Sequence, residues 1–123
     1  MPRLIPVTMK SPMVSYMPFP RFLMEEPFFT LSAEAKLLYV LMLDRAGISR
    51  ENNYLEADGR VKIYFTVDEI QARLNKGRQR TITVIRELEN SGLIIRRKRG
   101  QGRPAVITLN YPDSAKLIAK EPA

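Results

Sequence analysis

The segment from residue 66 to residue 92 restricts the fold of this chain more than any other part of the sequence. Thr66, followed three residues later by Glu69, forms a capping box, in which each side chain can bond a free backbone N–H at a helix start. Asn75 to Gly77 are turn residues. A second helical stretch, Arg78 to Ser91, ends at Gly92, because glycine readily adopts the left-handed conformation that closes helices. Two helices joined by so short a turn predict a helix-turn-helix unit.

The flanking residues predict the rest of the fold. Ser32 is a good N-cap, and the loop over residues 100–104, with two glycines, separates two β-rich stretches as the turn of a hairpin does. The further elements that we expect are a helix over 33–48, a strand over 61–65, a strand over 93–99 and a return strand over 105–110. The sequence therefore predicts an α+β fold, mainly α: a winged helix-turn-helix with a β-hairpin wing.

Basic charge is concentrated in the same part of the chain. The formal net charge is +7, and the 28 residues from Lys76 to Arg103 hold nine basic and two acidic residues, so they carry the whole excess. A solubilising surface would spread its charge more evenly. A focused positive surface attracts a polyanion, and we expect that polyanion to be a nucleic acid.

The predicted helix over 78–91 has two different faces. Thr81, Val84, Ile85 and Leu88 share one face and are expected in the core, although a core set of Ile82, Ile85 and Leu88 fits the spacing almost as well. Either choice leaves a polar face exposed, as a recognition helix in the major groove of DNA requires. We expect base-edge contacts from Arg78, Gln79, Arg80 and Thr83, and phosphate contacts from Lys76 and Arg86.

The predicted wing is a second basic element. A narrow loop with arginines can follow phosphates or enter a minor groove, although charged residues also protect the edges of sheets from aggregation. The wing residues that we expect to contact DNA are Arg97, Lys98, Arg99, Gln101 and Arg103.

Several classes of function lack the residues they need. The chain has no cysteine and no histidine, so we expect no disulfide, no zinc site, no cofactor and no catalytic site; the protein is not expected to be an enzyme. The longest apolar run, Leu37 to Leu43, is far shorter than the roughly 20 residues of a membrane span. We expect no contact with membrane and a cytoplasmic protein.

The chain divides into three parts. We expect a proline- and methionine-rich arm over 1–20, the winged-helix domain over 21–111, and a polar tail, or the start of a linker to an absent C-terminal domain, over 112–123. The arm is too apolar for a free tail, so it should pack on its own domain or on a partner subunit, although a disordered leader over residues 1–12 fits the sequence equally well. The helix over 33–48 is apolar on most sides, which also suggests a second subunit.

The sequence resembles the N-terminal domain of the RepA_N family of plasmid replication initiators from Gram-positive bacteria. The matching residues are Phe19 to Leu23, Leu31 to Tyr39, Leu43 to Arg45, Tyr64 to Thr66, Glu69 and Ile70, Gly92 to Ile94, and Gly100 to Pro104. The resemblance implies that the chain binds direct repeats (iterons) in a plasmid origin as a dimer. It also implies host replication proteins as partners, through a C-terminal domain that this chain lacks.

Two other classes of function remain open from the residues alone. A winged helix can serve as a transcriptional regulator, and some winged helices contact proteins instead of DNA. The focused charge favours DNA over a protein partner, and binding that tightens as the salt concentration falls would support DNA.

We predict a homodimer that forms through residues 13–45, because their apolar surface exceeds what one small domain needs. Sedimentation equilibrium at high protein concentration should give twice the monomer mass. A monomeric mass under those conditions would contradict the prediction.

Overall fold

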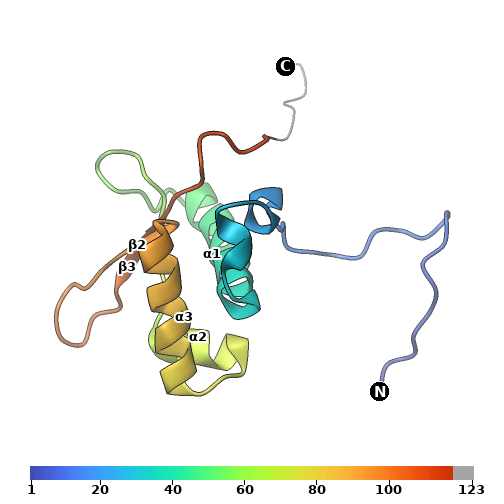
Figure 1. The fold of residues 1–123 in the computed structure, drawn as a ribbon, viewed down its shortest axis with the longest axis horizontal. Helices are drawn as coiled ribbons and strands as arrows, with labels where there is room; N and C mark the ends of the chain where they lie inside the picture. The colour runs from blue at the N-terminus through green and yellow to red at the C-terminus, as the bar shows by residue number, and fades with distance from the viewer. Residues whose placement is uncertain (118–123) are drawn as a thin grey trace.

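The computed structural model describes residues 1–117 and contains the elements that the sequence predicts (Figure 1). In chain order they are the 3-10 helices η1 (Arg21–Met24) and η2 (Phe28–Thr30), α1 (Ala33–Glu51), β1 (Lys62–Tyr64), α2 (Val67–Leu74), α3 (Arg78–Ser91), β2 (Ile94–Arg97) and β3 (Val106–Leu109). The predicted α+β winged helix-turn-helix fold is confirmed. Among the described residues, no helix is both long and apolar enough to cross a bilayer.

The helix-turn-helix forms as its local sequence dictates. The Thr66 hydroxyl accepts a hydrogen bond from the backbone N–H of Glu69 at 3.0 Å, and the Glu69 carboxylate accepts one from the backbone N–H of Thr66 at 3.2 Å. Asn75 ends α2 with φ of 53°, and Gly92 ends α3 with φ of 83°, both in the left-handed region. The bounds of α3 are those that the sequence predicts.

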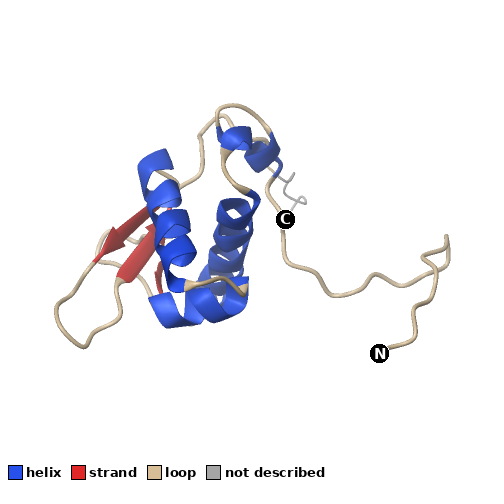
Figure 2. Ribbon diagram, turned by 60° about the horizontal axis from the view of Figure 1, so that its bottom comes forward, coloured by secondary structure: helices blue, strands red, loops and turns tan. Residues whose placement is uncertain are grey.

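The wing belongs to a three-stranded antiparallel sheet in the order β1-β3-β2 (Figure 2). Arg97 pairs with Val106, so residues 98–105 remain outside the ladder and β2 ends two residues before the predicted strand does. On the other edge of β3, Ile63 pairs with Ile107. The predicted hairpin is therefore extended by β1, which sequence spacing alone did not assign to this sheet.

Helix α1 is the centre of the core. Five consecutive residues, Leu38 to Met42, are at most 6% exposed, because α2, α3 and β1 all pack against this helix. Leu37 and Ile48 remain 43% and 57% exposed. The expectation that a second subunit covers α1 was wrong for most of the helix, since the chain itself covers it; the homodimer stays a prediction. Helix α1 also runs three residues beyond its predicted end.

Arg45 ties α1 to the start of the helix-turn-helix. Its guanidinium lies 3.7 Å from the centre of the Phe65 ring. The same group donates to the Tyr64 carbonyl at 2.8 Å and to the Glu69 carboxylate at 3.1 Å. Because Glu69 belongs to the capping box, this contact couples the start of α2 to α1.

The arm over residues 1–20 contains no helix or strand and runs away from the domain in Figure 1. Met9, Met13 and Tyr16 are 103%, 81% and 73% exposed. The alternative that the arm packs on its own domain was wrong; packing on a partner subunit stays a prediction. The predicted tail over 112–123 lies partly outside the described residues, because 118–123 are not described.

Tyr39 of α1 links the core to the residue that follows β3. Its side chain is fully buried, and its hydroxyl donates to the carbonyl of Asn110. Burial, with a smaller contribution from Tyr111, raises the pKa of Tyr39 to about 12 from its ordinary value of 10.0. The folded state therefore favours the neutral phenol.

We predict that Tyr39→Phe lowers the free energy of unfolding by ~1 kcal/mol at neutral pH, because the Asn110 carbonyl loses its donor. The raised pKa means that the wild-type tyrosine stabilises the fold fully below pH 10.0 and loses this effect as the pH rises towards about 12. Urea unfolding followed by circular dichroism at several alkaline pH values should show the wild type losing stability faster than the variant. Tyr54→Phe, at an exposed tyrosine, is the control; equal alkaline loss in wild type and Tyr39→Phe would contradict the prediction.

Candidate nucleic-acid interface

Helix α3 presents the polar face that the sequence predicts. Thr81, Val84 and Leu88 are fully buried and Ile85 is 3% exposed, whereas Ile82 is 36% exposed. The structure thus selects the first of the two core sets, and the set that places Ile82 in the core was wrong. Gln79, Thr83 and Arg86 are exposed on the opposite side, as expected.

The start of α3 is open to solvent. Gly77 is its N-cap and supplies no side chain, so no capping side chain bonds the first backbone N–H groups of α3, which carry the partial positive charge of the helix N-terminus. Lys76 and Arg78 are exposed beside it. Arg78 lies 3.3 Å from Asp68 of α2, and both side chains are mostly exposed, so this ion pair is weak and can exchange for another anion.

Arg80 does not project with the exposed face. Its Nε lies 3.0 Å from one oxygen of Glu34 in α1, and its Nη2 lies 3.3 Å from the other. The hydrogen bond from Arg80 holds the pKa of Glu34 below its ordinary value of 4.5, and the same bond raises the pKa of Arg80. For Arg80 to contact a base, its guanidinium must first leave Glu34.

A second contact joins the same two helices. Glu87 of α3 accepts hydrogen bonds from the backbone N–H of Ser32 at 2.6 Å and from its hydroxyl at 2.8 Å. The Ser32 hydroxyl also accepts from the backbone N–H of Ala35 at 3.1 Å, so it caps α1 while it binds α3. Together, the contacts of Glu34 with Arg80 and of Glu87 with Ser32 fix the orientation of α3 against the start of α1.

The wing loop, residues 98–105, turns at two glycines in the left-handed region, Gly100 with φ of 105° and Gly102 with φ of 77°. Arg99 donates to the carbonyl of Pro104 at 3.0 Å, and its guanidinium lies 4.8 Å from the centre of the Tyr64 ring. These contacts hold the base of the loop against the outer face of the sheet.

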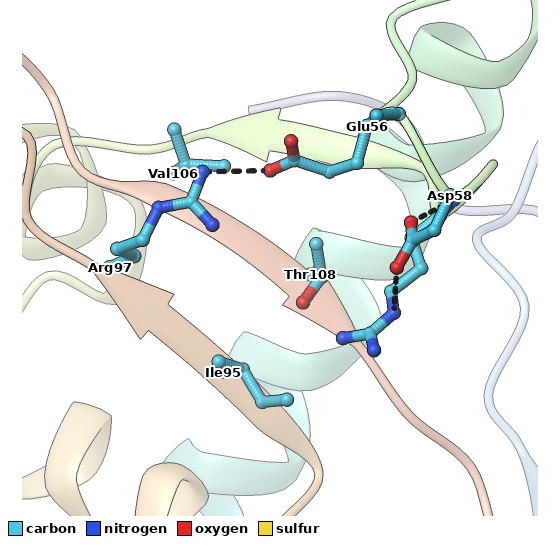
Figure 3. Close-up of a pocket in the computed structure, with 8 residues that line it drawn as sticks. Glu56, Asp58, Ile95, Arg97, Val106 and Thr108 are labelled. Atoms are coloured by element: carbon cyan, nitrogen blue, oxygen red, sulfur yellow. Dashed lines mark hydrogen bonds and ion pairs between the residues drawn. The ribbon is translucent and has the colours of Figure 1, made fainter.

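Arg97 occupies that same outer face. It lies in a hollow between the sheet and the loop over 56–60, and it points toward Glu56, with 3.0 Å between its Nη2 and the carboxylate (Figure 3). Thr108 lines the floor of the hollow, and Asp58 pairs with Arg60 at its rim. The remaining predicted wing residues, Lys98, Gln101 and Arg103, are exposed, and within the described part of the chain their side chains have no hydrogen bond.

Helix α3 lies between α1 and the wing loop, so α1 does not separate the loop from the exposed face of α3 (Figures 1 and 2). The structure thus places the predicted residues in two groups. The exposed residues without a charged partner among those described are Lys76, Gln79, Thr83, Arg86, Lys98, Gln101 and Arg103. Arg78, Arg80 and Arg97 have carboxylate partners, and Arg99 is held by Tyr64 and Pro104. The roles of all eleven in binding stay predictions.

Within residues 1–117, no three carboxylate side chains gather as a metal site would require. The predicted site residues that are exposed carry cationic, amide and hydroxyl groups, which can bind anions and the polar edges of bases.

Three helices, the third with its polar face outward, and a basic β-hairpin beside it define a winged helix-turn-helix domain. Residues 15–118 match the family model RepA_N, described as Replication initiator protein A (RepA) N-terminus. The chain belongs to this family, as its resemblance implied.

Other proteins resemble this chain in sequence or in structure. The chain is 31% identical over 104 residues to a "41 kDa protein" of Lactobacillus helveticus; the match covers 84% of this chain and 29% of that protein. A solved structure named "Structure of MDR initiator" has a TM-score of 0.68 and 28% identity, covering 83% of this chain and 81% of that one. A second, named "Structure of Rep-DNA complex", has a TM-score of 0.70 and 24% identity, covering 83% and 79%, and shows the shared fold.

We predict that Glu34→Gln destabilises the domain at neutral pH, because Arg80 loses its charged partner. The lowered pKa of Glu34 means that its stabilising effect is present above pH 4.5 and disappears as the pH falls through the folded-state pKa. Urea unfolding from neutral to acid pH should therefore show the wild type and the variant converging in acid. Glu89→Gln, at an exposed glutamate of α3, is the control. A constant difference across the range would contradict the prediction.

Proposed function

We propose that this chain binds double-stranded DNA at the direct repeats (iterons) of a plasmid replication origin, as the origin-recognition domain of a replication initiator. One observation carries the proposal: the polar face of α3 is exposed, and the basic wing loop lies beside it on the side away from α1. A recognition helix with its core face anchored and its N-terminal half free can enter a major groove.

Three kinds of contact follow from the side chains. Lys76 and Arg86 bind phosphates, and the open start of α3 supports them because free backbone N–H groups favour anions. Gln79 suits adenine, since its amide can donate to N7 and accept from N6, and Arg78 suits guanine. Lys98, Gln101 and Arg103 follow the neighbouring backbone or enter the minor groove.

Four residues require an exchange of partners on binding. Arg78, Arg80 and Arg97 leave Asp68, Glu34 and Glu56, respectively, and Arg99 leaves Pro104. A phosphate or a guanine edge can replace a carboxylate for a guanidinium, because both offer paired acceptors. The acidic partners keep these arginines ordered before DNA arrives.

Family membership and one neighbour support the proposal. The family is that of a replication initiator's N-terminus, and a solved structure with the same fold is named as a complex of Rep with DNA. The chain spans 29% of the length of the relative from Lactobacillus. We therefore assign host replication proteins to a part of the initiator outside this chain. We assign dimerisation to the arm and to the part of α1 within residues 13–45 that its own chain leaves exposed, such as Leu37. The setting that fits this function is the bacterial cytoplasm.

Selection of bound duplexes from a random pool, at two salt concentrations, tests the function. An origin-binding domain should enrich one motif and protect tandem copies of it in a plasmid origin from nuclease. Protection of a single palindrome at a promoter would favour a transcriptional regulator. Binding that does not change with salt would overturn DNA recognition in favour of a protein partner.

We predict that Arg86→Ala weakens binding to every duplex alike and reduces the slope of log K against log salt by about 1, because one phosphate contact is lost. Gln79→Ala should instead relax preference at one base pair, at a cost of ~1–3 kcal/mol. Fluorescence anisotropy of labelled duplexes across a salt series measures both effects.

Arg50→Ala is the matched control, because Arg50 is an exposed arginine near the end of α1, well away from Glu34 at its start. It should leave both the affinity and the slope unchanged. Equal losses for Arg50→Ala and Arg86→Ala would show that total charge, not the α3 face, governs binding.

A further inference from the structure

Ile82 is an apolar side chain on the otherwise polar face of α3. It is 36% exposed, and of its four neighbours on the helix surface Arg78, Gln79 and Arg86 are exposed, whereas Ile85 is buried. The core does not need Ile82, because Val84, Ile85 and Leu88 already fill the buried side of the helix.

Arg80 defines the direction in which Ile82 points. The Arg80 side chain reaches across to Glu34 in α1. Ile82 follows two residues later, which in an α-helix is a rotation of about 200°. Ile82 therefore points away from α1, toward the side of α3 on which the wing loop lies (Figure 1).

Ile82 also lies in the part of α3 that can reach bases. It is the fifth residue of the helix, one turn after Arg78, and so lies in the N-terminal half that enters a major groove. The next residue, Thr83, donates its hydroxyl to the carbonyl of Gln79 at 3.0 Å. That hydroxyl proton is therefore already bonded within the helix, so Arg78 and Gln79 are the polar side chains next to Ile82 that remain free to donate hydrogen bonds to base edges.

The major groove contains one apolar group that such a side chain can recognise, the C5 methyl group of thymine. We infer that Ile82 packs against a thymine methyl group and is a specificity-determining residue of this domain. The inference rests on the proposed function and extends it, because it names a base that the interface selects. Contact with a methyl group removes both apolar surfaces from water, whereas cytosine has only a hydrogen at C5 and so offers the isoleucine less apolar surface.

Replacing one thymine at a time by deoxyuridine tests this contact, because the two bases differ only in the C5 methyl group. The probe is the duplex that the wild-type chain selects from a random pool, and fluorescence anisotropy gives the affinity for each substituted duplex. For the wild type, uridine at one position should weaken binding about fourfold, as expected for a buried methyl group. Ile82→Ala should bind the thymine duplex more weakly and show no difference between thymine and uridine at that position.

Ile82→Val is the second variant, since it keeps β-branching and removes only the terminal methyl group. It should give an intermediate thymine preference, while circular dichroism shows an unchanged thermal midpoint. Ile48→Ala is the control: it removes an isoleucine that is 57% exposed near the end of α1, and it should leave the thymine preference intact.

The outcomes separate this inference from the proposed function. Salt-dependent binding with no position sensitive to uridine, or an Ile82→Ala variant that keeps the full thymine preference, overturns the role of Ile82 and leaves DNA recognition standing. A chain that binds no duplex at all overturns both.

Discussion

The packing of α3 against α1 is the interaction on which the rest of the interface depends. Val84 and Leu88 of α3 are fully buried in the same core as α1, and Glu87 accepts two hydrogen bonds from Ser32 at the start of α1. An amphipathic helix held by its apolar side has its polar side determined as well, because the two lie on opposite faces of one rigid cylinder. The direction of every exposed α3 side chain follows from this buried contact.

Charge at the interface is organised by acidic residues from outside the basic segment. Glu34, Glu56 and Asp68 come from α1, the loop before β1, and α2, and each holds one arginine at the surface. Such exposed pairs contribute little to stability, since water and salt screen them. They do restrict long side chains, which lowers the entropy lost when those side chains bind a ligand. Some of the basic side chains are therefore already ordered before any polyanion is present.

Sequence reasoning predicted much of the fold because its signals are local. The capping box at Thr66, the turn at Asn75 and the stop at Gly92 each depend on backbone groups within a few residues, so helix α3 was predicted to its ends. Strand pairing is not local. The β2–β3 register depends on which residues of the two strands meet in the folded sheet, so the strand before the wing was predicted too long. For the same reason the pairing of β1 with β3 was not assigned from the sequence.

By itself, the sequence determined the order of elements, the concentration of basic charge and the polarity of α3, because periodicity and composition are properties of the chain. Only the tertiary structure decided whether Ile82 lies in the core or faces solvent, and which arginines have carboxylate partners. The first required the actual rotation of α3 on its neighbours, since two core sets fitted the spacing. The second required contacts between residues far apart in the chain, such as Arg80 with Glu34, and only folding brings such residues together.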